Sequence, residues 1–521
     1  MIKVYINILI YQKVCYYLIN NYSGVVMIGR KKELKIFNEI CNNQNSSFVA
    51  VYGRRRIGKT YLVNYMFKEH RKECLFFNYT GISELPKEIQ IENFIDRIYE
   101  WFRVKPSQPI SNWSAVFRFL KYTIDDEVEK RNHKEKVIIF LDEIPWIDPN
   151  NRDGFLSALG YFWNTYCEER NNIVLVICGS NASWIKNRIF EESMGPLYKR
   201  LTHKIPMYPF NLHETKEYLT DEKGFNLDNK SIMEIYMVFG GVAKYLSYLD
   251  ARDSIATNIN KLFFDTEGFM FNEYHAVFRS LFMERANYHK SLVEVLCTKA
   301  RGLSVTELSK ALNLSIGGKL LSAISELEDS GFIQGISKFG NKRKGIRYIV
   351  SDSYILFHHK WIKELSRNDV ANLNEGYWSA VVGSQKYALW TGRSFEMVVI
   401  TNVKTYLNAR GAGGLFSGVY YWESKAKTEN ETGTQIDMVV EYGNGIYDIV
   451  ECKFYNQEYD ISKEYAQNMK NKMVMFRKYG LKRTQKGELK MVFLTTYGLV
   501  RNSAYNSLNI SGELTIDDLL G

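Results

Sequence analysis

Residues 47–67 of the chain read SFVAVYGRRRIGKTYLVNYMF. The β-branched and aromatic run at 47–52 predicts a buried strand, and residues 61–67 predict a helix. In the loop between them, Gly53 and Gly58 allow backbone N–H groups to turn inward around phosphate oxygens. The stretch therefore predicts a phosphate-binding loop between a strand and a helix.

The side chains of this loop have separate tasks in nucleotide chemistry. Lys59 is expected to reach the outer phosphates, and the Thr60 hydroxyl can coordinate Mg²⁺ at the helix N-terminus. The rest of the loop and the first helical residue are expected to line the same pocket: Arg54, Arg55, Arg56, Ile57 and Tyr61. The sequence thus predicts a magnesium nucleotide site with Lys59 as a catalytic residue.

A second apolar strand, at 137–141, ends in two carboxylates, Asp142 and Glu143. Ligands of an open parallel sheet bind at the carboxyl ends of its strands, so both side chains are expected near the phosphates. Asp142 is expected in the Mg²⁺ shell. Glu143 is expected to polarise the attacking water as general base.

A third strand, at 173–178, leads through a glycine to Ser180 and Asn181. A polar side chain at this strand end can contact the attacking water or the terminal phosphate. We expect one of the two to do so, and the sequence does not choose between them.

Residues 27 to about 250 resemble the AAA-type P-loop ATPases of the archaeal and bacterial branch close to the signal-transduction (STAND) NTPases. The matching stretches are IGR at 28–30 with Glu33-Leu34, GRRRIGKT, FLDEIPW at 140–146, CGSN at 178–181 and FGGVAKYL at 239–246. The resemblance implies ATP and Mg²⁺ as cofactors, with Gly29 and Arg30 near the adenine. Relatives usually have a proline where Ala243 stands in this chain.

The composition is that of a folded, multidomain protein. The chain has 521 residues, of which 45% are hydrophobic and 24% charged, and this composition excludes a largely disordered or collagen-like protein. Its seven cysteines never form CxxC pairs, so no disulfide framework or zinc knuckle is predicted. No apolar run reaches the roughly 20 residues of a membrane span, and we expect a cytoplasmic protein.

The predicted fold class is α/β, with a P-loop NTPase parallel sheet, a helical lid, a winged-helix domain and a C-terminal α/β restriction-endonuclease-like domain. The expected ranges are an extension outside the fold at 1–26, the ATPase core at 27–215, the lid at 216–286, the winged helix at 287–373 and the nuclease-like domain at 374–521. The oligomeric state is left open.

The predicted winged helix places a basic hairpin between strands at 332–337 and 347–350. The hairpin carries five cations and no acid within ten residues: Lys338, Lys342, Arg343, Lys344 and Arg347. Such a cluster can hold a nucleic-acid backbone without reading bases, so DNA is an expected partner. The alternatives are a solvated hairpin tip, or a wing that packs on the ATPase and relays its state.

The C-terminal region predicts a hairpin of strands 435–441 and 446–453 that turns at Gly443-Asn444-Gly445. A turn centred on Asn444 places Asp437 across from Glu451, with Lys453 on the same face. Two close carboxylates can bind Mg²⁺, and a neighbouring lysine can orient water, so phosphodiester hydrolysis is expected. The alternative is a salt-bridged hairpin without metal.

Asp437 and the Glu451-Cys452-Lys453 run resemble the PD-(D/E)xK pattern of restriction-endonuclease-like enzymes, and Glu396 matches the acidic residue of the preceding helix. The resemblance implies Glu396, Asp437 and Glu451 as metal ligands, and Glu451 and Lys453 as catalytic residues. The predicted function is an ATP-hydrolysing switch coupled to a Mg²⁺-dependent nuclease-like domain acting on nucleic acid. The alternative is a non-cleaving regulatory or DNA-binding module with a degenerate nuclease fold.

Overall fold

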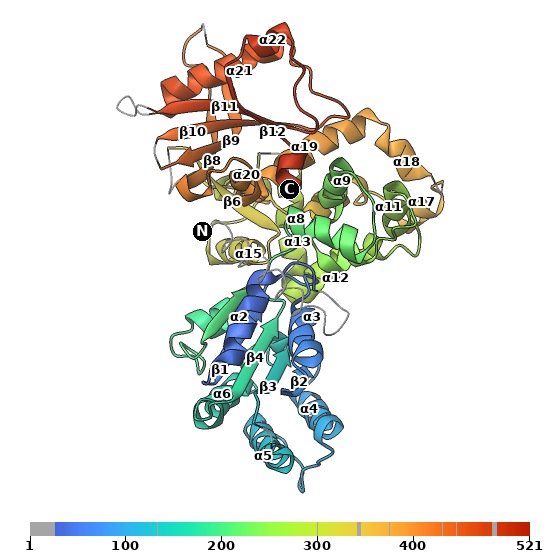
Figure 1. The fold of residues 1–521 in the computed structure, drawn as a ribbon, viewed down its shortest axis with the longest axis vertical. Helices are drawn as coiled ribbons and strands as arrows, with labels where there is room; N and C mark the ends of the chain where they lie inside the picture. Colours follow the sequence, from blue (N-terminus) through green and yellow to red (C-terminus); the bar gives the residue numbers. More distant parts are fainter. Residues whose placement is uncertain are drawn as a thin grey trace, which may run out of the picture. The chain divides into compact units, whose positions relative to one another are not determined.

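The computed structural model describes residues 27–521 apart from residues 133, 300, 341–344, 375, 430, 444 and 482–486. The chain divides into two compact units between Tyr208 and Pro209 (Figure 1), whereas the sequence-based boundary of the ATPase core is at residue 215. Three features predicted from sequence lie wholly or partly outside the described residues: the 1–26 extension, the hairpin turn at Asn444, and the basic hairpin at Lys342, Arg343 and Lys344.

The first unit contains a five-stranded parallel sheet in the order β2-β3-β4-β1-β5. Its strands are β1 (Ser47–Tyr52), β2 (Leu75–Thr80), β3 (Val137–Asp142), β4 (Ile173–Gly179) and β5 (His203–Pro206). Each strand predicted in this region is confirmed to within a few residues. The three inner strands, β3, β4 and β1, are almost entirely buried and apolar because helices cover both faces of this parallel sheet.

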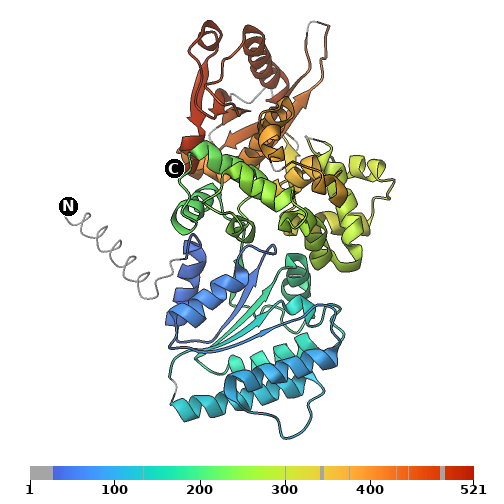
Figure 2. The ribbon, with the colours of Figure 1, turned by 90° about the vertical axis from the view of Figure 1, so that its right-hand side faces the viewer.

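Alternate side chains of β1 enter two separate cores. Phe48 and Ala50 pack on one face, among α4 (Lys87–Phe102), α5 (Trp113–Arg131) and α6 (Phe155–Phe162). On the other face, Val49 and Val51 pack with side chains of α2 (Lys31–Asn42) and α3 (Lys59–Asn64). Figure 2 shows the sheet between these two groups of helices. The sheet therefore holds α3, and with it the phosphate-binding loop, in a fixed place.

The second unit begins with a helical region and a short antiparallel hairpin. The elements are α8 (Leu212–Glu217), α9 (Asn229–Phe239), α10 (Ala243–Ser247), α11 (Ile255–Phe263), α12 (Phe269–Phe282), α13 (Ala286–Cys297), α14 (Val305–Ala311), α15 (Gly318–Asp329), β6 (Ile333–Lys338), β7 (Arg347–Val350), α16 (Ser353–Trp361), α17 (Arg367–Ala371) and α18 (Tyr377–Val382). Ser304 and Glu307 form a capping box at the start of α14.

The rest of the unit alternates helices with long strands. The elements are α19 (Gln385–Thr401), α20 (Val403–Ala409), β8 (Phe416–Ser424), β9 (Thr434–Tyr442), β10 (Ile446–Lys453), α21 (Lys463–Met475), β11 (Glu488–Thr495), α22 (Ser503–Asn506), β12 (Ile510–Thr515) and α23 (Ile516–Leu520). The sequence predicts one helix over 390–406, but the structure breaks it at Asn402 into α19 and α20.

One sheet of seven strands joins the hairpin to the C-terminal region, in the order β12-β11-β10-β9-β8-β6-β7. The junction is a parallel pairing of β6 with β8, in which Ser337 lies beside Tyr420 and Lys338 beside Tyr421. The strands were predicted separately, and this pairing was not predicted. It makes the basic hairpin the edge of the C-terminal sheet.

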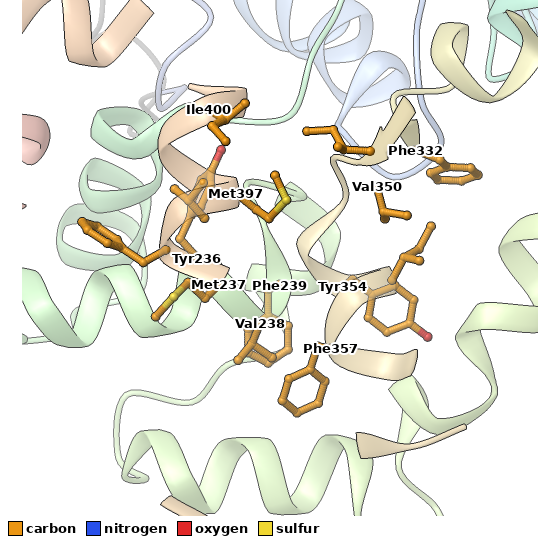
Figure 3. Packing of buried hydrophobic residues seen from close by; sticks show 14 of the residues in the cluster. Tyr236, Met237, Val238, Phe239, Phe332, Val350, Tyr354, Phe357, Met397 and Ile400 are labelled. Carbon is orange, nitrogen blue, oxygen red and sulfur yellow. The ribbon is translucent and has the colours of Figure 1, made fainter. Parts of the chain in front are cut away.

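A single hydrophobic core runs through the three segments expected as lid, winged helix and nuclease-like domain. Figure 3 shows side chains from α9, the hairpin, α16 and α19 in this core, among them Tyr236, Met237, Val238, Phe239, Phe332, Val350, Tyr354, Phe357, Met397 and Ile400. The C-terminal helix α23 takes part in this core through Ile516, Leu519 and Leu520. The structure thus groups the three segments in one unit.

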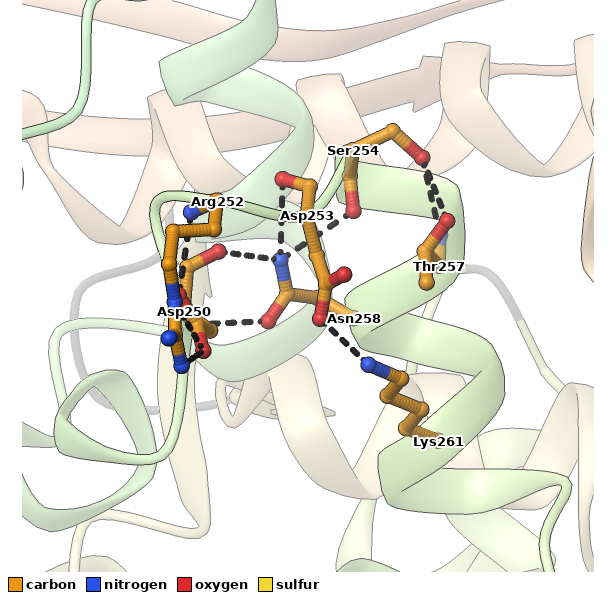
Figure 4. Close-up of polar contacts among 7 residues, drawn as sticks. All are labelled: Asp250, Arg252, Asp253, Ser254, Thr257, Asn258 and Lys261. Carbon is orange, nitrogen blue, oxygen red and sulfur yellow. Dashed lines mark hydrogen bonds and ion pairs between the residues drawn. The ribbon is translucent and has the colours of Figure 1, made fainter.

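The turn between α10 and α11 is closed by a polar cluster (Figure 4). The buried Asn258 side chain accepts a hydrogen bond from the backbone of Asp250 and donates to the carbonyls of Asp250 and Ser254. The Ser254 hydroxyl caps α11 by accepting from the Thr257 N–H, and Lys261 pairs with Asp253 at 2.7 Å. These contacts fix a tight turn, which is a structural role.

Among the described helices, none combines the length and the apolar character that a bilayer crossing needs.

Candidate functional site

The loop after β1 has the backbone that phosphate binding requires. Gly53 has φ 144°, and a Cβ atom at this position would lie 2.2 Å from the carbonyl oxygen of Met207. Gly58, with φ 93°, is the N-cap of α3. Because L-residues rarely adopt these angles, both glycines are needed for the turn that brings the loop to the helix N-terminus.

Lys59, Thr60 and Asp142 lie together at the carboxyl ends of β1 and β3. The Lys59 side chain is buried, and its Nζ donates a hydrogen bond to the Arg54 carbonyl at 2.9 Å. Thr60 Oγ1 donates to Asp142 Oδ2 at 2.6 Å. A hydroxyl and a carboxylate oxygen at this separation are the hard ligands that Mg²⁺ prefers, so these two residues suit the predicted metal site. The ion would shield phosphate charge there.

Glu143 points toward the end of β4. The residue has φ 47°, and its Oε2 accepts a hydrogen bond from the backbone N–H of Ser180 at 3.0 Å. The Ser180 hydroxyl donates to the other carboxylate oxygen. Asn181 acts differently, since its side chain accepts from the Trp184 N–H and caps α7 (Ala182–Ile185). Ser180, one of the two polar residues predicted at this strand end, thus contacts the predicted base.

Other predicted nucleotide-contacting residues have structural partners of their own. Gly29 has φ 65°, and Arg30 is buried with its guanidinium donating to the carbonyls of Ile57 and Tyr208, both at 2.8 Å. The Arg55 guanidinium lies 5.8 Å from the centre of the Trp146 ring, and Tyr61 is half exposed. Arg54 is buried, and Arg56 has a left-handed backbone with φ 71°. Their contacts with nucleotide stay predictions.

Comparison with protein families identifies this part of the chain. Residues 27–249 match the family described as an ATPase domain predominantly from Archaea. The chain contains a P-loop ATPase domain. The match covers the phosphate-binding loop, both strand-end carboxylates and the predicted segment at 239–246, and it supports the P-loop ATPase part of the resemblance.

Two curated relatives come from the archaeon Methanocaldococcus jannaschii. One, an uncharacterised protein, is 24% identical over 378 residues, which are 72% of this chain and 76% of the relative. The other, an uncharacterised ATP-binding protein, is 37% identical over 51 residues, which are 10% of this chain and 85% of the relative.

Two solved structures were also compared with the chain. The Walker-type ATPase of Pyrococcus abyssi is 15% identical with a TM-score of 0.44, covering 64% of this chain and 96% of that one. The ORC1 protein of Aeropyrum pernix, solved in complex with DNA, is 16% identical with a TM-score of 0.35, covering 68% of this chain and 93% of that one.

A second group of charged side chains lies on the C-terminal sheet. The predicted hairpin register is confirmed, because Val450 of β10 pairs with Met438 of β9 and the next residues along are Glu451 and Asp437. Lys453 shares this face, with its Nζ 2.8 Å from Glu451 Oε1. The structure therefore brings together the three residues predicted on this hairpin.

Two further partners of Glu451 come from α21 and were not predicted. Lys472 Nζ lies 2.8 Å from Glu451 Oε2, and the Tyr465 hydroxyl donates to Oε1. Although burial of Glu451 favours a higher pKa, the charges of Lys472 and Lys453 outweigh it and hold the pKa at about 2. Tyr465 and Lys472 are seven residues apart, so they share one helix face, and this spacing was the available signal.

Glu396 of α19 lies near Asp437 and lines the same cavity. Burial, with the negative charges of Asp437 and Glu451, raises its pKa to about 7. The three carboxylates offer the oxygen donors that Mg²⁺ takes. Within the described ranges, however, no three Asp, Glu, His or Cys side chains are grouped so that they could hold one ion. As arranged, the cluster matches the salt-bridged alternative more closely than a formed metal site.

The described cations of the basic hairpin are paired with an acid of the neighbouring strand. Lys338 Nζ lies 3.6 Å and an Arg347 guanidinium nitrogen 3.4 Å from Glu423 Oε1. Arg347 also stacks over the Tyr421 ring, 5.1 Å from its centre. Because Glu423 offsets part of this charge, the two side chains are less available to a polyanion than the sequence suggested.

Proposed function

We propose that the protein is an ATP-hydrolysing switch coupled to a Mg²⁺-dependent nuclease-like domain acting on nucleic acid. The observation that carries the first half is the hydrogen bond from Thr60 to Asp142 beside the buried Lys59. In phosphoryl transfer the protein acts chiefly by positioning the reacting groups and stabilising charge. Lys59, Thr60 and Asp142 are of the residue types that do so. Glu143 is proposed as the base, with Ser180 as its orienting partner.

The ATPase half is tested with two variants of the full chain. Lys59→Ala should abolish ATP binding, because the charge facing the outer phosphates is lost. Glu143→Gln should still bind ATP but turn over at least about a hundredfold more slowly. Lys130→Ala, on the exposed end of α5, is the matched control and should behave as wild type. Normal turnover by Glu143→Gln would remove Glu143 from the role of base.

The nuclease half rests on the shared face of Asp437, Glu451 and Lys453 and on the nearby Glu396. In this proposal Glu396, Asp437 and Glu451 are the metal ligands, and Lys453 acts on water or on phosphate charge. A metal would require Glu451 to give up the contact with Lys472 that it makes in the structure.

A second candidate is favoured by that same contact. Glu451 already pairs with two lysines and a tyrosine, as in a fold that no longer cuts. In this alternative the protein is an ATP-dependent regulatory or DNA-binding module. Cleavage assays separate the two candidates: cutting that needs Mg²⁺ and is lost in both Asp437→Asn and Lys453→Ala supports the nuclease. The exposed Glu429→Gln is the control.

Coupling is tested by combining the two halves. If the nucleotide state controls cutting, Lys59→Ala should remove the ATP dependence of cleavage while leaving Asp437 and Lys453 intact. Cleavage with equal rates in wild type and Lys59→Ala, with and without ATP, would mean that the two activities are independent.

A further inference from the structure

The second unit contains a cavity of about 220 Å³ beside the carboxylate cluster. Three arginines from separate elements line it: Arg301 after α13, Arg347 on β7 and Arg393 on α19. Two members of the carboxylate cluster, Glu396 and Asp437, line it as well. The cavity therefore extends from the hairpin segment to the C-terminal sheet, which the β6–β8 pairing joins.

The backbone fixes the position of Arg301. Its neighbour Gly302 has φ 67°, and a Cβ atom there would lie 2.3 Å from the carbonyl oxygen of Tyr348. Leu303 and Tyr348 exchange backbone hydrogen bonds at 3.1 and 2.9 Å. The loop thus packs against β7, and Arg301 lines the same cavity as Arg347, although the two are 46 residues apart in sequence.

The other two arginines are also held in place. Arg393 donates a hydrogen bond to the carbonyl of Cys297 at the end of α13, at 3.2 Å. Arg347 is held by Glu423 and by the Tyr421 ring. Among the described residues, Arg301 has no ion pair within 4.0 Å. Three guanidinium groups and two carboxylates line the cavity. Because Arg347 also pairs with Glu423 and Glu307, Arg301 and Arg393 contribute most of the positive charge that a ligand could use.

Guanidinium groups are suited to phosphate, because their planar donors match its oxygens in pairs. The cavity is smaller than the roughly 300–1,000 Å³ of sites for drug-sized ligands, so it suits a phosphate group better than a whole nucleotide. We propose that Arg301, Arg347 and Arg393 form a binding site for one backbone phosphate of a nucleic-acid strand, held next to Glu396 and Asp437. This proposal rests on the proposed nuclease-like function. It adds the residues that would hold the phosphate of the nucleic-acid substrate.

The test is equilibrium binding of a labelled single-stranded oligonucleotide to the full chain. EDTA is present, so that metal-dependent cleavage cannot occur during the measurement. Arg301→Gln and Arg393→Gln should each weaken binding about tenfold and lower the slope of log Kd against log salt by about one. Arg367→Gln, on exposed α17, should match wild type. Arg393→Lys, which keeps the charge but loses the paired donors, should be intermediate. Unchanged thermal unfolding shows that the variants are folded.

The possible outcomes are separable from those of the nuclease proposal. Weakened binding in both arginine variants supports the site even if no condition gives cleavage. Wild-type binding by folded Arg301→Gln and Arg393→Gln overturns the site, even if Asp437-dependent cleavage is found. If inorganic phosphate binds in an arginine-dependent way while the oligonucleotide does not bind, the ligand is a small anion and the nucleic-acid assignment is wrong.

Discussion

The backbone N–H of Ser180 donates a hydrogen bond to Glu143 Oε2 at 3.0 Å, and the hydroxyl of the same residue donates to Oε1. Two donors from the end of one strand thus orient the carboxylate that ends the neighbouring strand. Ser180→Ala removes one of them. We expect kcat for ATP hydrolysis to fall about tenfold, which corresponds to one hydrogen bond to a charged group, with little change in KM. Steady-state kinetics measure both, and an increase in kcat would show that Ser180 holds Glu143 in an inactive position.

Lys472 is predicted to stabilise the C-terminal sheet through Glu451. Lys472→Gln leaves one oxygen of a largely buried carboxylate without its charged partner, and we expect a loss of about 1–3 kcal/mol in unfolding free energy. Urea denaturation followed by circular dichroism measures the change. Lys463→Gln, exposed at the start of the same helix, should change stability by less than about 0.5 kcal/mol. Equal effects of the two substitutions would contradict the prediction.

Asp448 is a fully buried carboxylate that links α20 to the sheet. It accepts hydrogen bonds from Tyr406 at 2.7 Å, from Tyr442 at 2.8 Å and from Arg410 Nε at 3.0 Å. Asp448→Ala leaves the partly buried Arg410 cation and two buried hydroxyls without this acceptor, so we expect a loss of about 3–5 kcal/mol. Thermal or urea unfolding tests this. A variant as stable as the exposed control Glu429→Ala would show that the network is dispensable.

The contribution of Glu326 to the free energy of unfolding depends on pH. Burial favours a higher pKa for this carboxyl, but hydrogen bonds from His289 and Ser322 and the charge of Arg285 outweigh burial and lower the pKa below 4.5. A lowered pKa in the folded state means that the stabilisation is present above pH 4.5 and is lost as the pH falls through the folded-state value.

The stability difference between wild type and Glu326→Gln should therefore be largest near neutral pH and should shrink below pH 4.5. Urea titrations at a series of pH values measure it. Glu364→Gln, on an exposed position, is the control and should show no such trend. A difference that stays constant down to pH 3 would mean that Glu326 has no lowered pKa.

The C-terminal hairpin shows how far sequence reasoning reached at the candidate site. The turn residues and the alternation of side chains gave the correct register, because both are local properties of the two strands. The same reasoning missed Lys472 and Tyr465, since the docking of α21 on the sheet depends on packing between distant segments. It also left open whether Glu451 faces a metal or a lysine, which depends on side-chain rotamers.

By itself, the sequence determined the phosphate-binding loop, the buried strands beside it and the helices and strands of the hairpin segment, because local spacing and hydrophobic period define each of them. Only the tertiary structure decided that β6 joins β8, that one core unites the segments after Pro209, and that Arg301, Arg347 and Arg393 line one cavity. Strand neighbours and shared cavities arise from contacts between residues far apart in the chain, and no local pattern records such contacts.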